Sequence, residues 1–212
     1  MSPEQKNAIK EIIDLFDKAE EKVKEVEQLA QELSVPSINE LRYVGYHLAR
    51  AFCEEDHQEL NIQITKAQGH CKRAIYDAHE IGIIFMLEQI KIFKETYIPF
   101  SSSVIKMIPS YTQELSTTSK ASQFIAEVKE KHRNNRDAYY KECEPYYLSL
   151  RNILEKIAIA EPLINQDITE KRENDQKNTR RFITTIIISL LSITVSITIG
   201  LVVIYLKLNG TS

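Results

Sequence analysis

The feature that most constrains this chain is an uncharged run near its C-terminus. From residue 182 to residue 206 there are 25 consecutive residues without Asp, Glu, Lys, Arg, His, Asn or Gln. A helix of about 20 apolar residues spans the hydrocarbon core of a bilayer, and a longer one spans it with some tilt. A core helix of this composition would need a much larger protein to cover it on every side. The run therefore predicts a single transmembrane helix over residues 182–206.

Basic residues flank the run unequally. Only Lys207 follows it closely, whereas five basic residues precede it: Lys171, Arg172, Lys177, Arg180 and Arg181. Positive residues stay on the cytoplasmic side, so we expect a cytoplasmic N-terminal region and a short extracytoplasmic tail at residues 207–212. Insertion would follow the tail-anchored route. The basic residues belong to a juxtamembrane stalk, residues 171–181, which we expect to contact anionic headgroups at about 1 kcal/mol per cation.

The run carries a stripe of small residues at spacings of 4, 3, 4 and 4: Thr185, Ser189, Ser192, Ser196 and Gly200. Such patterns let two helices approach closely in lipid, so the stripe is a candidate face for association of transmembrane helices. In the alternative interpretation, the hydroxyl groups bond to carbonyls of their own helix. With no charge inside the span, a proton relay there is not expected.

The residues before the run carry 26 Lys and Arg against 30 Asp and Glu, a net charge of −4. Sequence-independent nucleic-acid binding depends on neutralising phosphates, so no nucleic-acid partner is expected. Three scattered cysteines, Cys53, Cys71 and Cys143, do not form a disulfide framework. We expect them to be free, buried thiols.

Apolar spacing predicts helices throughout residues 1–170. Ser2 and Pro3 suit the start of a first helix, which Val35 and Pro36 stop. Its 3-4 spaced seam comprises Ile9, Ile12, Phe16, Ala19, Val23, Val26, Ala30 and Leu33. Ser37 and Glu40 form a capping-box pattern for a second helix. Its packing face would contain Leu41, Val44, Leu48 and Phe52, with Gly45 and Ala49 permitting close contact.

A third helix is expected over residues 60–97, with a buried stripe of Ile64, Ala67, Cys71, Ala74, Ala78, Ile81, Phe85 and Ile92. Pro99 ends it, and an irregular stretch continues to Pro109. The apolar pattern resumes at residue 111, where Pro145 should kink or divide it and Pro162 could do so again. Its stripe runs through Leu115, Thr118, Ser122, Ile125, Val128, His132, Tyr139, Cys143, Tyr146, Leu150, Ile153, Ile157 and Ile164.

The predicted fold is all-α. It is an elongated bundle of four or five long, coiled-coil-like helices over residues 1–170, followed by the C-terminal transmembrane helix.

A segment rich in polar side chains, residues 70–80, is the strongest candidate for chemistry. His70 and His79 are nine residues apart and point to opposite sides of a helix, which argues against a shared metal or catalytic site. Lys66, His70, Arg73 and Asp77 lie instead on one solvated face, a possible partner surface. His132 falls on an apolar stripe and is expected to be a core histidine. No nucleotide-binding or hydrolase motif occurs, so we expect no enzyme activity, cofactor or metal.

A helical cytoplasmic region followed by a tail anchor resembles, in outline, the SNARE proteins of membrane fusion. Their uninterrupted heptad motif has a Gln or Arg in its central layer. Here Pro145 and Pro162 interrupt the corresponding stretch, and Tyr139 or Cys143 occupies the middle layer, so the SNARE function is not transferred.

The sequence thus favours a non-enzymatic, tail-anchored protein that acts through helix–helix contacts as an adaptor, scaffold or tether. Its expected partners are membrane lipids and either another protein or a second copy of itself. The alternative is a membrane effector that oligomerises through its transmembrane helix to perturb the bilayer, with the helical region as sensor.

Overall fold

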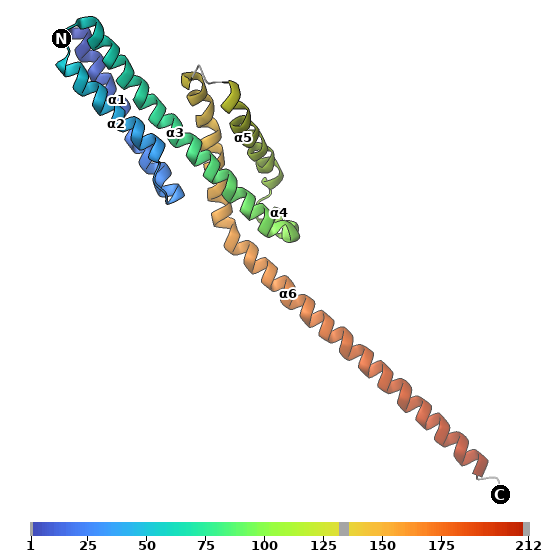
Figure 1. Cartoon of the computed structure of the whole chain (residues 1–212). Helices are drawn as coiled ribbons and strands as arrows, with labels where there is room; N and C mark the ends of the chain where they lie inside the picture. Colours follow the sequence, from blue (N-terminus) through green and yellow to red (C-terminus); the bar gives the residue numbers. More distant parts are fainter. Residues whose placement is uncertain (1, 132–135, 210–212) are drawn as a thin grey trace. The chain divides into compact units, whose positions relative to one another are not determined.

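The structure, a computed structural model, describes residues 2–131 and 136–209, with side-chain detail for residues 2–127 and 141–205. The helices are α1 (Pro3–Ala30), α2 (Val35–Cys53), α3 (His57–Tyr97), the 3-10 helix η1 (Ile98–Phe100), α4 (Ser101–Met107), α5 (Tyr111–Lys131) and α6 (Arg136–Asn209) (Figure 1). No strand occurs in the described ranges, which confirms the all-α prediction. The chain divides into two compact units, Met1–Ala160 and Glu161–Ser212, here called the first and second unit.

Helix α1 begins as predicted. The backbone N–H of Gln5 donates to Ser2 Oγ over 3.3 Å, and the N–H of Ser2 donates to Gln5 Oε1 over 2.7 Å, so both free donors are satisfied. The helix ends at Ala30, where Gln31 adopts a left-handed conformation with φ of 56°. Leu33, predicted as the last member of the α1 seam, therefore lies beyond the helix and is exposed.

Helix α2 begins earlier than predicted, at Val35, with Ser34 as its N-cap. Pro36 is tolerated because N–H groups in the first helical turn have no intrahelical acceptor. The predicted capping box of Ser37 and Glu40 is therefore wrong. Ser37 is buried in the first turn with its Oγ 2.6 Å from Ser34 Oγ, and Glu40 contacts α3 instead.

The first half of α3 packs against α1 and α2. Their shared core consists of Ile12, Val44, Ala51, Leu60, Ile64, Ala67 and Cys71, with Ala8, Ile9, Leu15, Phe16 and Leu48 packed around it. A second cluster joins Ala19 on α1 to Ala74 and Ile75 on α3, with Leu41 of α2 against it. The predicted inner positions of α1 and of the first half of α3 are thus confirmed.

The packing face of α2 is partly different from the prediction. Val44 is buried and Leu41 and Leu48 are partly buried, as expected, and Ala51 completes this inner face. Phe52, Gly45 and Ala49 were predicted on the same face but are exposed. Because successive helical residues turn by about 100°, they cannot share a face with Ala51.

The buried face of α3 changes register along its length. Ile81 and Phe85, which were predicted to be buried, are half-buried, and Ile92 is exposed. Ala78 is buried as predicted, and the large apolar residues buried beyond it are Ile83, Met86, Ile90, Phe93 and Tyr97. The predicted stripe has 3.5 residues per turn, whereas a straight helix has 3.6, so the two differ by about 20° per heptad. Over the 41 residues of α3 this difference moves the predicted stripe off the buried face.

Pro99 ends α3 as predicted, but the segment that follows is regular. Residues 98–107 form η1 and α4 in place of the expected irregular stretch, and Ser103 and Val104 are buried. Proline is accepted in the first turn of the 3-10 helix for the same reason as in α2.

Helix α6 is continuous through both prolines, so neither Pro145 nor Pro162 divides this run, and a kink at either stays a prediction. Pro145 and Pro162 each leave the carbonyl four residues earlier without its helical donor, and those carbonyls belong to Lys141 and Ala158, which are exposed and can bond to water.

Among the α6 tyrosines described with side chains, Tyr147 is buried, whereas Tyr146, which was predicted to be buried, is half-buried. In the preceding helix, Ile125 is buried as expected, Thr118 and Leu115 are half-buried and Ser122 is exposed. The predictions for His132, Val128 and Tyr139 fall outside the residues described with side chains.

The cysteines are free thiols. Cys71 and Cys143 are buried as predicted, but Cys53 is exposed at the last position of α2. Burial raises the pKa of the Cys71 thiol to about 11.

Candidate functional site

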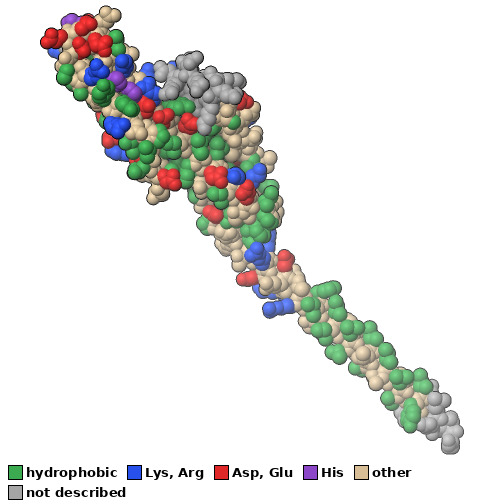
Figure 2. Space-filling view, in the orientation of Figure 1, with side chains coloured by type: hydrophobic (Ala, Val, Ile, Leu, Met, Phe, Trp, Pro, Cys, Tyr) green, Lys and Arg blue, Asp and Glu red, His purple; other side chains and the backbone are tan. Residues whose placement is uncertain are grey.

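The C-terminal part of α6 has the properties of a membrane span. Within residues 141–205 lies a segment long and apolar enough to cross a bilayer, and every residue from 182 to 205 is exposed. Figure 2 shows hydrophobic side chains along this segment and charged side chains before it. An apolar surface of this length is stable in a hydrocarbon environment rather than in water, which indicates membrane association.

The basic stalk and the small-residue stripe both lie on this helix. Lys171, Arg172, Lys177, Arg180 and Arg181 are exposed, and Lys171 forms an ion pair with Asp167 over 2.8 Å. The stripe hydroxyls each donate to the carbonyl four residues earlier over 2.8–3.0 Å: Thr185 to Arg181, Ser189 to Thr185, Ser192 to Ile188 and Ser196 to Ser192. In the single chain, the stripe hydroxyls therefore bond to carbonyls of their own helix. Association of two transmembrane helices through the stripe, including Gly200, stays a prediction.

The predicted partner surface on α3 is partly assembled by α2. His70 and Arg73 come together around Glu40 of α2, Lys66 is exposed, and Asp77 is half-buried one turn beyond Arg73. The face is therefore not simply solvated, because half of it forms the junction between α2 and α3. Glu40 was missed since its sequence context suggested a cap.

Three charged or polar groups meet within hydrogen-bonding distance at this junction. Glu40 Oε2 lies 2.6 Å from His70 Nδ1 and 2.7 Å from Arg73 Nε, and Arg73 Nη2 lies 2.6 Å from the same His70 nitrogen. One imidazole nitrogen cannot donate to Glu40 and accept from Arg73 at once, so these contacts belong to alternative tautomers. The Arg73–Glu40 pair is compatible with either.

The ionisation of the trio follows from this geometry. Burial opposes ionisation of Glu40, but hydrogen bonds from Arg73 and His70 outweigh it and keep the pKa of this carboxyl below its usual value. Burial lowers the pKa of His70 and the charge of Arg73 lowers it further, against the opposing bond to Glu40. At neutral pH the junction therefore contains an Arg–carboxylate pair beside a neutral imidazole.

A column of rings extends from this junction along α2. The Tyr43 and His70 rings stack with centroids 5.2 Å apart, and His70 stacks on His47 at 5.0 Å. His47 Nδ1 lies 2.7 Å from Gln63 Oε1, which fixes the orientation of its ring. The sequence signal for this column was the spacing of Tyr43 with His47, and of Gln63 with His70, on their helix faces.

Two arginines lie over the exposed tyrosines of α2. The Arg42 guanidinium lies 5.5 Å from the Tyr43 ring centroid, and that of Arg50 lies 5.8 Å from the Tyr46 centroid. Arg50 Nη1 also donates to the Tyr46 hydroxyl over 3.2 Å. These cation–π contacts hold both side chains against the outer surface of α2.

A second polar cluster, with buried rings and an exposed ion pair, lies in the first unit where α1, α3 and residues 147–151 of α6 meet. The Tyr147 hydroxyl donates to Glu25 Oε1 over 3.1 Å, and Arg151 forms an ion pair with the same carboxylate. The His79 and Tyr147 rings meet edge to face at 5.0 Å. Burial lowers the pKa of His79 to about 4 and raises that of Tyr147, so both rings are neutral at pH 7.

Gly82 makes room for the Tyr147 ring. A Cβ at this position would lie 2.6 Å from Tyr147 Cε2 and 3.2 Å from Val26 Cγ2, which is closer than side chains pack. The close approach of Tyr147 and Val26 thus explains a glycine inside α3.

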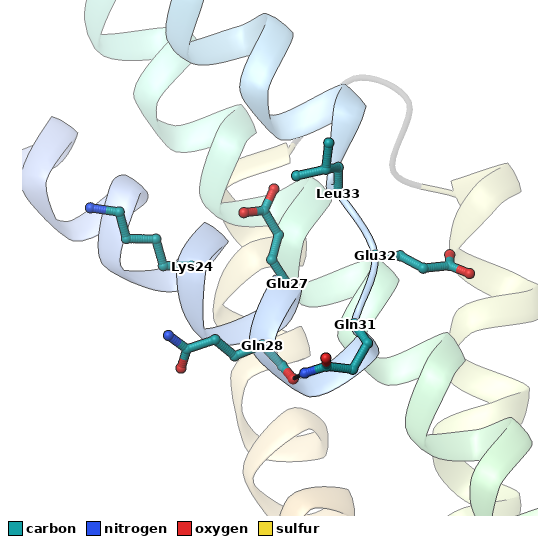
Figure 3. Close-up of a pocket in the computed structure, with 6 residues that line it drawn as sticks. All are labelled: Lys24, Glu27, Gln28, Gln31, Glu32 and Leu33. Atoms are coloured by element: carbon teal, nitrogen blue, oxygen red, sulfur yellow. Dashed lines mark hydrogen bonds between the residues drawn. The ribbon is translucent and has the colours of Figure 1, made fainter.

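A shallow hollow of about 360 Å³ lies at the turn between α1 and α2 (Figure 3). Its lining residues are Lys24, Glu27, Gln28, Gln31, Glu32 and Leu33. The side chain of Gln31 donates to the Gln28 carbonyl over 2.6 Å, and Glu27 accepts the Ser34 N–H over 2.9 Å. These polar groups thus stabilise the turn.

Within residues 2–127 and 141–205, no group of three or more His, Cys, Asp or Glu side chains is placed to hold a metal ion. The described clusters can stabilise helix packing and present aromatic and cationic groups to a partner.

Comparison with known proteins gives no relative. No protein-family model matches the chain, and no curated protein or solved structure is significantly similar to it.

Proposed function

We propose that this protein is anchored in a membrane by residues 182–206 and acts through contacts with another protein, as an adaptor, scaffold or tether. The proposal has the helical region in the cytoplasm and residues 207–212 on the other side. It includes no enzymatic step.

The exposed apolar segment of α6 carries this proposal. Its 24 described residues, 182–205, are all exposed and uncharged, and a basic stalk precedes them. In contrast, the first unit packs an apolar core, and its buried Tyr147 hydroxyl donates to Glu25. A tether needs a folded region for binding and a membrane span for anchoring, and this chain has a folded region followed in sequence by a candidate span.

The anchor and its orientation are tested by fractionation and protease protection. The full chain should resist carbonate extraction from membranes, whereas a chain ending at residue 181 should be soluble. Protease added to the cytoplasmic face of sealed vesicles should remove an N-terminal epitope. Recovery of the full chain in the carbonate supernatant would refute the anchor, and a protected epitope would refute the orientation.

The small-residue stripe supports the second candidate, a membrane effector whose anchors cluster and perturb the bilayer. Replacing Ser192, Ser196 and Gly200 with Leu blocks close approach of two helices, so it should abolish crosslinked oligomers and dye leakage from vesicles. A triple variant that still clusters and leaks like the parent excludes this mechanism. Replacing Ile187, Ile197 and Val202 with Leu, on the other side of the helix, is the matched control.

A further inference from the structure

The outer face of α2 has the spacing of a coiled-coil seam. At intervals of 3, 4, 3, 4 and 3 residues this face presents Val35, Ile38, Arg42, Gly45, Ala49 and Phe52, here called the outer seam. Every one of these side chains is exposed, and Val35, Ile38 and Phe52 are 41–68% exposed. Such spacing is typical of helices that pack against another helix.

No other described part of the first unit covers this seam. Helix α2 packs mainly on α3 through its opposite face, which contains Val44 and Ala51. A Cβ added at Gly45 would meet no atom within 4 Å. Figure 2 shows hydrophobic and basic side chains intermixed in the region where Figure 1 places α2. Two small residues at the centre would let a partner helix approach closely.

The charges of this face select the partner. Arg42 lies within the seam and Arg50 beside it, whereas the one carboxylate of α2, Glu40, is turned toward Arg73 and His70. Arg42 has no salt bridge in the part of the chain that the structure describes; its contact is the Tyr43 ring. An apolar surface over Arg42 would remove water from the guanidinium without giving it a counter-charge, which is energetically costly. A stable complex therefore needs a carboxylate opposite Arg42.

Two other occupants fit less well. In a parallel pair of α2 helices, Arg42 faces its own copy, and in an antiparallel pair the two guanidiniums lie about one turn apart with no seam carboxylate between them. An anionic bilayer would be repelled by the first unit, which carries 21 Lys and Arg against 25 Asp and Glu.

We infer that the outer seam of α2 docks a helix of a different protein, one with an apolar stripe and a carboxylate that pairs with Arg42. This inference deepens the proposed tether function by naming its contact surface and the chemistry of its partner. Tyr43, Tyr46 and Arg50 flank the seam and belong to the residue types enriched at binding hot spots.

Photo-crosslinking of the full chain in its own membrane tests the inference. Benzoylphenylalanine replaces Ile38 or Phe52, and the adducts are mapped by mass spectrometry. We expect adducts on a helical segment of another polypeptide, with Asp or Glu within about one turn of the residue crosslinked from position 38 and about ten residues from the one crosslinked from position 52. Arg42→Glu should reduce their yield at least about tenfold, and Arg42→Lys should retain most of it.

Matched controls separate docking from general effects. Lys10→Glu makes the same charge change on the exposed surface of α1 and should leave the yield unchanged. Benzoylphenylalanine at Ile13, 55% exposed on α1, should give no such adduct. Circular dichroism at 222 nm establishes that each variant is folded.

Adducts to a second copy or to lipid, no adduct above the Ile13 control, or a yield indifferent to Arg42→Glu would each overturn the inference. Carbonate extraction of the same samples reports separately on the anchor, so failure of the membrane proposal is distinguishable from failure of the docking surface.

Discussion

The two units of this chain use the same apolar residue types in opposite ways. In the first unit, isoleucines such as Ile12, Ile64 and Ile83 are at most 4% exposed, and charged residues cover the outside. In the second unit, Ile193 and Ile197 are more than half exposed, and no charge lies nearby in sequence. In a helix that packs on a core and faces water, apolar residues recur with a period of about 3.6 and so lie on one face. A helix that is apolar on all sides lacks this period and has a uniform apolar environment. The pattern of apolar residues along the sequence thus indicates whether a helix faces water or lipid.

The strongest test of this difference between the units is to place charged residues in the apolar segment of the second unit. The double substitution Ile193→Arg and Ile197→Arg should cost about 5–7 kcal/mol of insertion free energy, because each arginine near the bilayer centre costs about 2.5–3.5 kcal/mol. We expect the variant to be lost from the carbonate-resistant membrane fraction. Ile13→Arg, on the exposed surface of α1, should remain membrane-bound like the parent. A double variant that resists extraction would contradict the assignment of the span.

Acid should destabilise the first unit through His79. Its folded pKa of about 4 lies below its ordinary 6.5, so the unfolded chain binds the additional proton. Stability is therefore full above pH 6.5 and falls as pH decreases toward 4, by roughly 3 kcal/mol over this window. The charges of Lys22 and Lys18 act in the same direction as burial, and Glu25 opposes them.

Urea unfolding of the full chain in nonionic detergent, followed at 222 nm, measures this dependence. His79→Phe should flatten it between pH 6.5 and 4.5, whereas His57→Phe should not, because His57 is exposed. Equal slopes in the two variants would show that another group titrates.

Two glycines provide a matched pair within the first unit. Gly82→Ala should lower the free energy of unfolding by about 1–3 kcal/mol, because the new methyl group collides with the Tyr147 ring. Gly45→Ala should raise it by about 0.5–1 kcal/mol, since the methyl group meets open space and alanine favours a helix. Urea midpoints that shift in the same direction would count against the tight contact at Gly82.

The smallest effect is expected at the turn after α1. Gln31→Gly should stabilise the first unit by about 0.5–1 kcal/mol, because glycine adopts the observed φ of 56° without a Cβ clash. Gln28→Gly, inside the exposed face of α1, should destabilise it by about 1 kcal/mol. A lower urea midpoint for Gln31→Gly would mean that its bond to the Gln28 carbonyl outweighs the backbone gain.

Much of the helical fold could be predicted from sequence, because the signals are local. The cap at Ser2, the end of α3 before Pro99 and the inner positions Ile64, Ala67 and Cys71 follow from residue type and spacing. Errors arose where the deciding partner is distant in sequence. Which face of α2 packs inward depends on α3, and whether Tyr146 or Tyr147 is buried depends on the notch at Gly82.

The candidate site was harder to predict for the same reason. His70 and Arg73 were recognised as one face of α3, but their partner Glu40 lies about 30 residues earlier on another helix. The outer seam was not recognised as a separate surface because three of its members, Gly45, Ala49 and Phe52, also fit a single apolar stripe with Leu48. Only the position of α3 separates the two faces of α2.

The exposure of Cys53 has a practical chemical consequence. Its thiol lies at the last position of α2, directly after Phe52 of the outer seam, while Cys71 and Cys143 are buried. Only the thiolate reacts with maleimides, and burial holds the pKa of Cys71 near 11, so brief labelling at neutral pH should modify Cys53 selectively. The unaltered protein therefore accepts a fluorophore or spin label beside its inferred docking surface, without cysteine engineering.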